Sequence, residues 1–412
     1  MSLTKLAQDG GSPVRTDKLP PRYVGVNLIG EEEKKLVCEV IDSKCLFRHY
    51  GPGTPHFAND LEREFKEYIG TKYALATATG SGAYFSAMRA LEIGPGDEVI
   101  IPAFGWITDY AMVDFFGATP VFAAIDESMN ISVEDFEAKI TDKTKVVVII
   151  YYQGAAARID EIVEIAHNHG IKVFEDVAQA CGCEYKGKKL GNWGDIACYS
   201  LQNNKIISCG DGGLLVTNDQ KMYELAVRYH DLGLMRDTFK ANLEGPQLTD
   251  AIAGQQWRIN ELSAAVGLAQ LRKLPSIVKN CQEKAGYLRG ELLRKFPNLK
   301  FRAADPKDDI GILVAFDLGS NENVQFFAKA YEAEGLVYGP TSWCETINKI
   351  PPVAVRMKEN GIFEQKTFDV TNEIDLRVAK LAILPVYSDR DMSDITTAAI
   401  KVLDVMIELK MI

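Results

Sequence analysis

Lys205 lies in a sequence context that suits covalent chemistry. It occupies a polar loop between an apolar stretch that ends at Ser200 and the glycine-rich turn CGDGG. Any single lysine is most often a solvated surface charge. Burial among hydrophobic neighbours would instead lower its pKa toward the range of a nucleophile and Schiff-base former. Lys205 is therefore the first candidate for a reactive group.

Asp176 is the second candidate, and it ends the apolar stretch KVFED at residues 172–176. Ligands of open α/β sheets bind at the carboxyl ends of the strands, where this side chain is expected. A carboxylate there could stabilise the protonated ring nitrogen of a cofactor. Aspartate is also a preferred helix N-cap, so the two interpretations are equally open for this residue alone.

A turn that could bind phosphate occurs at residues 77–84, TATGSGAY. The backbone N–H groups of Gly80, Ser81 and Gly82 could contact an anion at the start of a helix, where the helix dipole favours negative charge. The hydroxyl groups of Thr79 and Ser81 add donors. The motif is weak alone, because most such turns bind nothing.

Together these groups match the requirements of pyridoxal phosphate. That cofactor needs a lysine for a Schiff base, a carboxylate at the pyridine nitrogen, donors for its phosphate, and a flat group over its ring. The hypothesis at this point is an enzyme that depends on pyridoxal phosphate.

The elements expected around these residues indicate an α/β protein. Helical and strand patterns alternate from Gly30 to about residue 220, with continuous apolar strands such as VVVIIYY at 146–152. Such strands are typical of a mostly parallel sheet covered by helices on both faces. A helical stretch from about 260 to 296, broken at Pro275, leads into a mixture of strands and helices. We therefore expect an N-terminal segment at 1–29, a large domain at 30–275 and a smaller α+β domain at 276–412.

Composition excludes several classes of function. The net charge is -11, from 57 acidic and 46 basic residues, which gives no basic surface for nucleic acid or an anionic membrane. No apolar run is long enough to cross a bilayer, and the start lacks a signal peptide. The 8 cysteines form no CxxC pair and are typical of reduced thiols. His167 and His169 lack a third ligand nearby, so no metal is expected. We expect a cytoplasmic protein.

Three long segments resemble the DegT/StrS family of sugar aminotransferases, which use pyridoxal phosphate on a type I fold. Residues 175–219 (EDVAQACGCEY to CGDGGLLVTND) resemble the family's core signature. Residues 79–126 (TGSGAYFSAM to TPVFAAID) resemble its phosphate and ring-stacking segments. Residues 254–274 (GQQWRINELSAAVGLAQLRKL) resemble its dimer-contact helix.

The resemblance implies a role for each matching residue. Lys205 would form the Schiff base and shuttle protons, and Asp176 would face the pyridine nitrogen. Gln179 would lie near the ring hydroxyl, and Trp106 would stack on the ring, although a tryptophan is often ordinary core. The other implied contacts are Gly80, Ser81 and Ser200 at the phosphate, Gln256 at the cofactor of the partner subunit in a homodimer with shared sites, and Arg48 and Arg258 at the substrate. An internal salt bridge is the alternative for Arg258.

Several positions depart from the family's pattern. Tyr151 replaces a histidine, Gln256 replaces the asparagine of GxNxR, and Arg158 stands where an acid is common. Leu201 and Gln202 replace the more frequent Phe-His before the lysine. These changes leave the cofactor residues intact and leave the substrate open.

The leading hypothesis is a ping-pong aminotransferase. Glutamate or glutamine would donate the amino group to a keto-sugar, keto-cyclitol or related polyhydroxy carbonyl compound. A sugar dehydratase that uses pyridoxal or pyridoxamine phosphate is an alternative, but such enzymes have usually replaced the lysine by histidine. A non-catalytic regulatory protein that binds the cofactor is a third, disfavoured by the acidic balance and the lack of a DNA-binding appendage.

Overall fold

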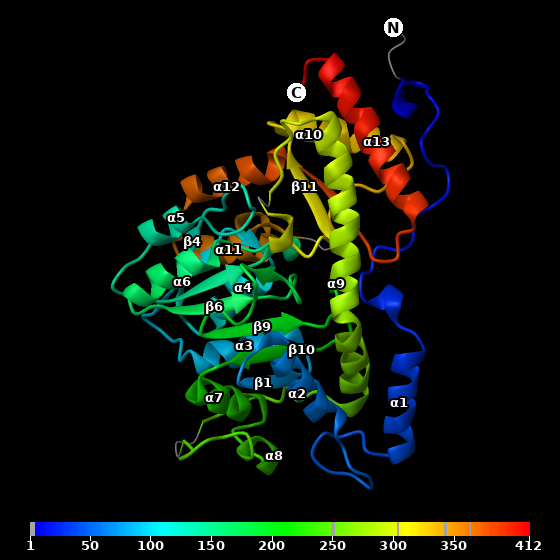
Figure 1. Cartoon of the computed structure of the whole chain (residues 1–412). Helices are drawn as coiled ribbons and strands as arrows, with labels where there is room; N and C mark the ends of the chain where they lie inside the picture. The colour runs from blue at the N-terminus through cyan, green and yellow to red at the C-terminus, as the bar shows by residue number, and fades with distance from the viewer. Residues whose placement is uncertain (1–4, 249–251, 303–304, 342–343, 363) are drawn as a thin grey trace.

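The computed structural model describes residues 5–248, 252–302, 305–341, 344–362 and 364–412 (Figure 1), so the first four residues of the expected N-terminal segment lie outside it. A seven-stranded sheet forms the centre, with the strand order β1-β10-β9-β6-β5-β2-β4. β10 runs in the opposite direction to the other six strands of this sheet. The strands are β1 (Tyr73–Thr77), β2 (Glu98–Pro102), β4 (Thr119–Ala123), β5 (Thr144–Ile150), β6 (Lys172–Asp176), β9 (Ile196–Ser200) and β10 (Gly213–Thr217).

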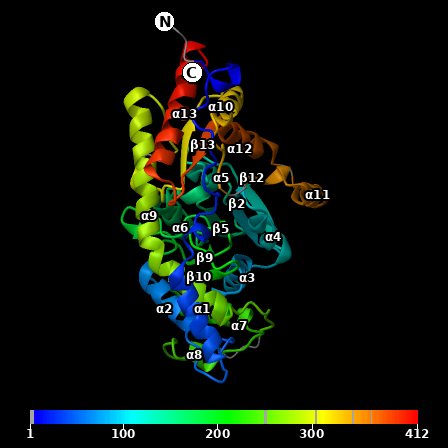
Figure 2. The ribbon, with the colours of Figure 1, turned by 90° about the vertical axis from the view of Figure 1, so that its right-hand side faces the viewer.

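Apolar clusters cover both faces of this sheet. Along β5, Val147 and Ile149 pack into one cluster and Val146 and Val148 into the other, because successive side chains point to opposite faces. Figure 2 shows α9 on one side of the strands and α4 on the other. The helices of the first side are α1 (Glu31–Ser43), α2 (Phe57–Ile69), α5 (Val133–Ala138), α6 (Ile159–Asn168) and α9 (Glu261–Lys295); those of the second are α3 (Gly80–Ala90), α4 (Ile107–Phe115) and α7 (Gln220–His230).

The C-terminal part has its own apolar cluster around a two-stranded antiparallel sheet of β11 and β13. Leu6, near the start of the chain, packs into the same cluster. The C-terminal part also contacts the large domain, because its strand β12 pairs with β3, the short strand that follows β2. The elements are β11 (Leu313–Asp317), α10 (Asn321–Ala333), β12 (Glu345–Thr346), α11 (Pro351–Glu359), α12 (Gln365–Arg377), β13 (Val378–Ala382) and α13 (Asp389–Glu408); the short elements elsewhere are β3 (Phe104–Gly105), β7 (Glu184–Tyr185), β8 (Lys188–Lys189) and α8 (Asp237–Lys240).

Helix α9 is continuous, which corrects the expected break at Pro275. The helix extends through this proline, whose missing N–H and ring normally interrupt the hydrogen-bond ladder. Leu274 and Ile277 on either side are buried, so packing compensates for the lost bond. Figure 1 shows α9 passing beside the sheet and continuing to β11. The proposed domain division at residue 275 therefore lies inside one helix.

Among the described residues, no helix is long and apolar enough to cross a membrane. The same residues contain no group of three or more histidine, cysteine, aspartate or glutamate side chains that could hold a metal ion.

Candidate active site

A cavity of about 560 Å³ lies at the carboxyl ends of β6 and β9, against the start of α3. It contains every predicted cofactor contact except Gln256. Those residues are Gly80, Ser81, Trp106, Asp176, Gln179, Ser200 and Lys205; the rest of the lining is Thr79, Tyr84, Thr108, Asp109, Ala178, Cys198, Tyr199, Gln202, Asn204, Asp211 and Trp257. A wider cleft of about 880 Å³ near the C-terminus contains none of them.

Asp176 faces this cavity at the last residue of β6. The backbone N–H of Ala178 donates to its Oδ1 over 2.9 Å. A turn rather than a helix follows, so Asp176 caps no helix of the described chain. Burial raises the pKa of Asp176, opposed by the Ala178 N–H and by the positive charge of Lys205. The geometry supports the cofactor interpretation over the helix cap.

Lys205 projects into the same cavity from the loop after β9. Two backbone contacts anchor the residue: its N–H donates to the carbonyl of Gln202 over 2.9 Å, and its carbonyl accepts from Gly25 over 3.0 Å. Ile206 and Ile207, which follow it, are buried. The backbone is therefore fixed on both sides while the long side chain stays available to the cavity.

The start of α3 forms an anion-binding corner. The Thr79 hydroxyl caps the helix by accepting from the N–H of Gly82 over 2.9 Å. The first N–H groups of a helix have no partner within it, which leaves those of Gly80 and Ser81 for a ligand. A Cβ at Gly80 would lie 2.9 Å from the Cβ of Ser200, so only glycine allows this close approach. The Ser200 hydroxyl adds a donor at the same corner.

Two tryptophans border the cavity. Trp106 is the N-cap residue of α4, is 45% exposed and lines the cavity. Trp257, which the sequence did not single out, packs against Gly82, where a Cβ would meet its ring at 3.1 Å. Its ring stacks on Phe85 with centroids 5.6 Å apart. Its buried Nε1 has no hydrogen-bond partner among the described residues. Such a donor is typical of a site where a ligand supplies the acceptor atom.

Gln179 presents a donor to the cavity. Its Oε1 accepts from the backbone N–H of Gln153 over 3.2 Å and from the Nε2 of the same residue over 3.0 Å. Because a backbone N–H can only donate, the oxygen must face Gln153. The amide nitrogen then points the other way and contacts the Cys344 sulfur at 3.2 Å. Gln179 can therefore donate a hydrogen bond to an oxygen atom on a ligand's ring.

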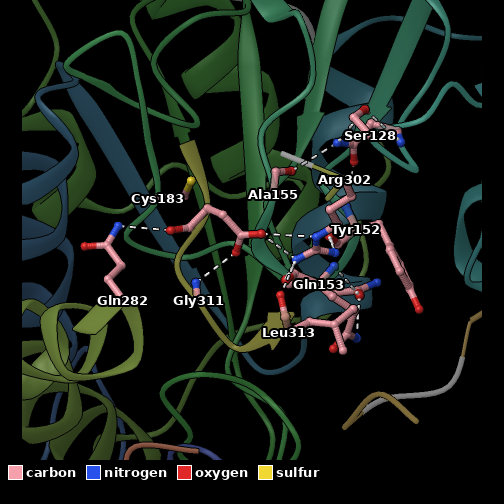
Figure 3. Close-up of polar contacts among 12 residues, drawn as sticks. Ser128, Tyr152, Gln153, Ala155, Cys183, Gln282, Arg302, Gly311 and Leu313 are labelled. Carbon is pink, nitrogen blue, oxygen red and sulfur yellow. Dashed lines mark hydrogen bonds and ion pairs between the residues drawn. The ribbon is translucent and has the colours of Figure 1, made fainter. Parts of the chain in front are cut away.

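Arg302 fixes the turn at Gln153, with which Gln179 is hydrogen-bonded; Figure 3 shows the Arg302 guanidinium beside Tyr152 and Gln153. Gln153 has a left-handed backbone with φ 46° and ψ 37°, which is unfavourable for a residue with a Cβ. The Arg302 guanidinium donates to the carbonyls of Tyr152 and Gln153 over 2.9 and 2.8 Å. It also pairs with Asp309 at 2.8 Å. Residues beyond α9 thus stabilise one wall of the cavity.

The departures Tyr151 and Arg158 lie outside the cavity. Tyr151 is buried behind the sheet, where its hydroxyl donates to the Glu175 carboxylate over 2.7 Å. Arg158 forms surface ion pairs with Glu134 and Glu161. Neither side chain can contact a ligand in the cavity.

The structure does not bring Arg48, Arg258 and Gln256 to the cavity. Arg48 is buried and pairs with Glu62 at 2.9 Å. Arg258 pairs with the buried carboxylate of Asp231, which is the internal salt bridge considered from the sequence. Gln256 is exposed. Within the described chain, none of the three lines the pocket that contains Lys205.

The cavity fits pyridoxal phosphate. The N–H groups at α3 and the Ser200 hydroxyl suit a phosphate, and Gly80 leaves the space for it. Asp176 suits a protonated ring nitrogen, Gln179 suits a ring oxygen, and Lys205 lies in the same cavity to form the covalent link.

Comparison with known proteins places the chain among the aminotransferases. Residues 27–399 match the DegT/DnrJ/EryC1/StrS aminotransferase family. The chain is 34% identical over 255 residues to a GDP-perosamine synthase of Escherichia coli O157:H7, covering 62% of this chain and 66% of that protein. It is 33% identical over 267 residues to the GDP-perosamine synthase of Vibrio cholerae, covering 65% and 69%. The match to the first thus spans slightly less than two thirds of its length.

A solved structure of the aminotransferase from Psychrobacter cryohalolentis matches with a TM-score of 0.80 at 24% identity, covering 92% of this chain and 98% of that one. This likeness confirms the α/β fold with a mostly parallel sheet. The matches also confirm the enzyme class and the cofactor that the resemblance implied. The chain belongs to the DegT/DnrJ/EryC1/StrS family of aminotransferases, which use pyridoxal phosphate.

Proposed function

We propose that this protein transfers the amino group of glutamate or glutamine to a keto-sugar, a keto-cyclitol or a related polyhydroxy carbonyl compound. The observation that supports it best is the joint placement of Lys205 and Asp176 in one cavity, beside the phosphate corner at α3. The similar GDP-perosamine synthases are named after an amino sugar, which agrees with a sugar substrate for this protein.

When bound, pyridoxal phosphate supplies an electron sink that makes the α-proton of an amino acid acidic. Lys205 is then the general base that removes this proton and later returns one to the carbonyl carbon of the acceptor. Asp176 keeps the ring nitrogen protonated, and Gly80, Ser81 and Ser200 hold the phosphate. Trp106 covers the ring and limits the access of water.

The lysine distinguishes this proposal from the two alternatives. A dehydratase of this family would have usually replaced Lys205, so its presence favours amino transfer. A regulatory protein that only binds the cofactor would not need a mobile base in the cavity.

A visible absorbance change tests the function directly. Protein loaded with pyridoxal phosphate should lose its yellow colour on addition of glutamate or glutamine, and a matching keto-sugar should restore it. A panel of keto-sugars and a scyllo-inosose would identify the acceptor class. Borohydride reduction followed by peptide mapping should label Lys205, and Lys205→Ala should show neither the label nor turnover. If no amino donor changes the spectrum, the aminotransferase proposal is wrong.

We also propose that a second copy of the chain completes each site. Among the described residues that line the cavity, Lys205 is the only cation, whereas Asp109, Asp176 and Asp211 are acidic. The described lining of one chain therefore offers the carboxylates of an acidic donor no cation besides Lys205. Exposed Gln256 precedes a helix suited to close packing, and a two-fold dimer would carry it to the neighbouring cavity.

Mixing two inactive variants tests this second proposal. Lys205→Ala subunits mixed with Gln256→Ala subunits should regain part of the activity, because each heterodimer contains one site with both residues intact. If subunits exchange and no activity returns, each chain has a self-sufficient site.

A further inference from the structure

Asp109 is a buried carboxyl group that the proposed function does not use. It lies in the first turn of α4, is 0% exposed, and lines the cavity with Asp176. Its Oδ2 accepts from the backbone N–H of Trp106 over 3.3 Å. Its Oδ1 is buried, and the nearby hydroxyl of Tyr84 interacts with the carboxyl group, but neither atom makes a hydrogen bond of good geometry among the described residues.

Among the described residues, the largest influences on the Asp109 carboxyl group include no cation. Taking an ionised carboxylate out of water without a partner costs far more than a typical protein can supply, so such a group keeps its proton instead. Two carboxyl groups that share a dry site cannot both be charged. The ionisable groups that face the pair are Tyr84, Cys198, Lys205 and Cys344.

The electrostatics of the pair agree with this geometry. Burial and then the charge of Asp176 raise the pKa of Asp109 well above its usual range, against the opposing effects of the Tyr84 hydroxyl and the Trp106 N–H. The pKa of Asp176 is also raised by burial, but the Ala178 N–H, Lys205 and Asp109 itself oppose that increase. Of the two carboxyl groups, Asp109 is therefore the one that holds a proton more strongly.

We propose that Asp109 is a positioning residue: as a neutral acid it donates a hydrogen bond from Oδ1 to the carboxylate of Asp176 and so keeps Asp176 charged at the cofactor's ring nitrogen. The proposal rests on the cofactor site described above. Asp109 would then make two contacts, one with the backbone N–H of Trp106 and one with the carboxylate of Asp176. A donor that stabilises the Asp176 anion lowers its basicity, so the proton stays on the ring nitrogen.

Two variants of similar size test the role of the donor. Asp109→Asn keeps an uncharged side chain that can donate, whereas Asp109→Leu removes the donor and excludes water. With pyridoxal phosphate labelled with ¹⁵N in the ring, the nitrogen shift of the bound cofactor reports its protonation whether or not the enzyme turns over. Asp109→Asn should match the unmodified protein at neutral pH. Asp109→Leu should shift toward the unprotonated nitrogen, with kcat reduced roughly tenfold or more, the scale of one hydrogen bond to a charged group.

A second measurement needs no cofactor. Infrared spectra of the cofactor-free protein at neutral pH should contain the band of a protonated carboxyl group, and Asp109→Asn should remove it. Absence of this band would overturn the proposal even if amino transfer is established. An unchanged ¹⁵N shift in Asp109→Leu, or the same displaced shift in Asp109→Asn, would also overturn it. A protein that shows the band but no transamination would contradict only the proposed function.

Discussion

Glu175 and Asp176 are neighbours on β6, yet their carboxyl groups have opposite environments. Glu175 points behind the sheet and accepts four hydrogen bonds, from the N–H groups of Gly191, Trp193 and Gly194 and from the Tyr151 hydroxyl. Asp176 points into the cavity and has one backbone donor and a second acid, Asp109, beside it. Burial raises the pKa of both carboxyl groups.

The difference separates a structural acid from a functional one. A buried polar group whose bonds are all made within the chain stabilises the fold and has nothing left for a ligand. A buried acid whose oxygens lack hydrogen-bond donors destabilises the folded state, and such groups concentrate at functional sites. Two neighbouring carboxyl groups therefore have different roles, because successive side chains of a strand point to opposite faces of the sheet.

The largest effect expected within this comparison is that of Asp176→Asn on turnover. A neutral amide cannot stabilise the protonated ring nitrogen, so kcat should fall roughly a hundredfold or more, the scale of one preorganised electrostatic contact. The cofactor should remain bound through Lys205 and the phosphate corner. Steady-state kinetics at saturating amino donor measure kcat of Asp176→Asn and of the unmodified protein. Unchanged turnover would show that Asp176 has no role in the chemistry.

Glu175→Gln is the matched change on the other face and should act on stability. Gln retains one oxygen, but its amide nitrogen would replace the oxygen that accepts from Gly191 and Tyr151, leaving a buried donor unpaired. Such a loss costs about 1–3 kcal/mol of unfolding free energy. Urea unfolding should detect it, while kcat stays within about threefold. A large fall in kcat without a loss of stability would remove the distinction between the two faces.

The smallest expected effect is a pH dependence of stability that Asp109 produces. Its raised pKa means that the folded protein keeps a proton that the unfolded chain loses above about pH 4. Stability from this group is thus fully present below that pH and decreases as the pH rises toward the folded-state pKa.

Asp109→Asn should remove that pH dependence, because an amide does not titrate. With the cofactor removed from both proteins, the advantage of the variant in urea unfolding should grow from pH 5 to pH 7. A constant difference between the two proteins over this range would mean that Asp109 does not hold a proton in the folded state.

The sequence predicted most of the fold because its signals are local. The continuous apolar runs that became β5, β6 and β9 predicted a buried, mostly parallel sheet, and the position of Asp176 at a strand end predicted where it would face. The reversed direction of β10 had no such signal, since a strand's direction depends on its partners. The continuity of α9 through Pro275 was likewise missed, because packing on both sides outweighs the local preference of proline.

The residues of the site divide in the same way. Lys205, Asp176 and the Gly80–Ser81 turn were identifiable from the sequence alone, because a reactive lysine, a strand-end acid and a glycine turn each have a local signature. Asp109, Trp257 and Arg302 became meaningful only in the tertiary structure. Asp109 looks like an ordinary first-turn acid until α4 packs beside β2 and β4 and brings it into the cavity that Asp176 also lines. Burial and unpaired atoms arise only when distant segments meet and exclude water.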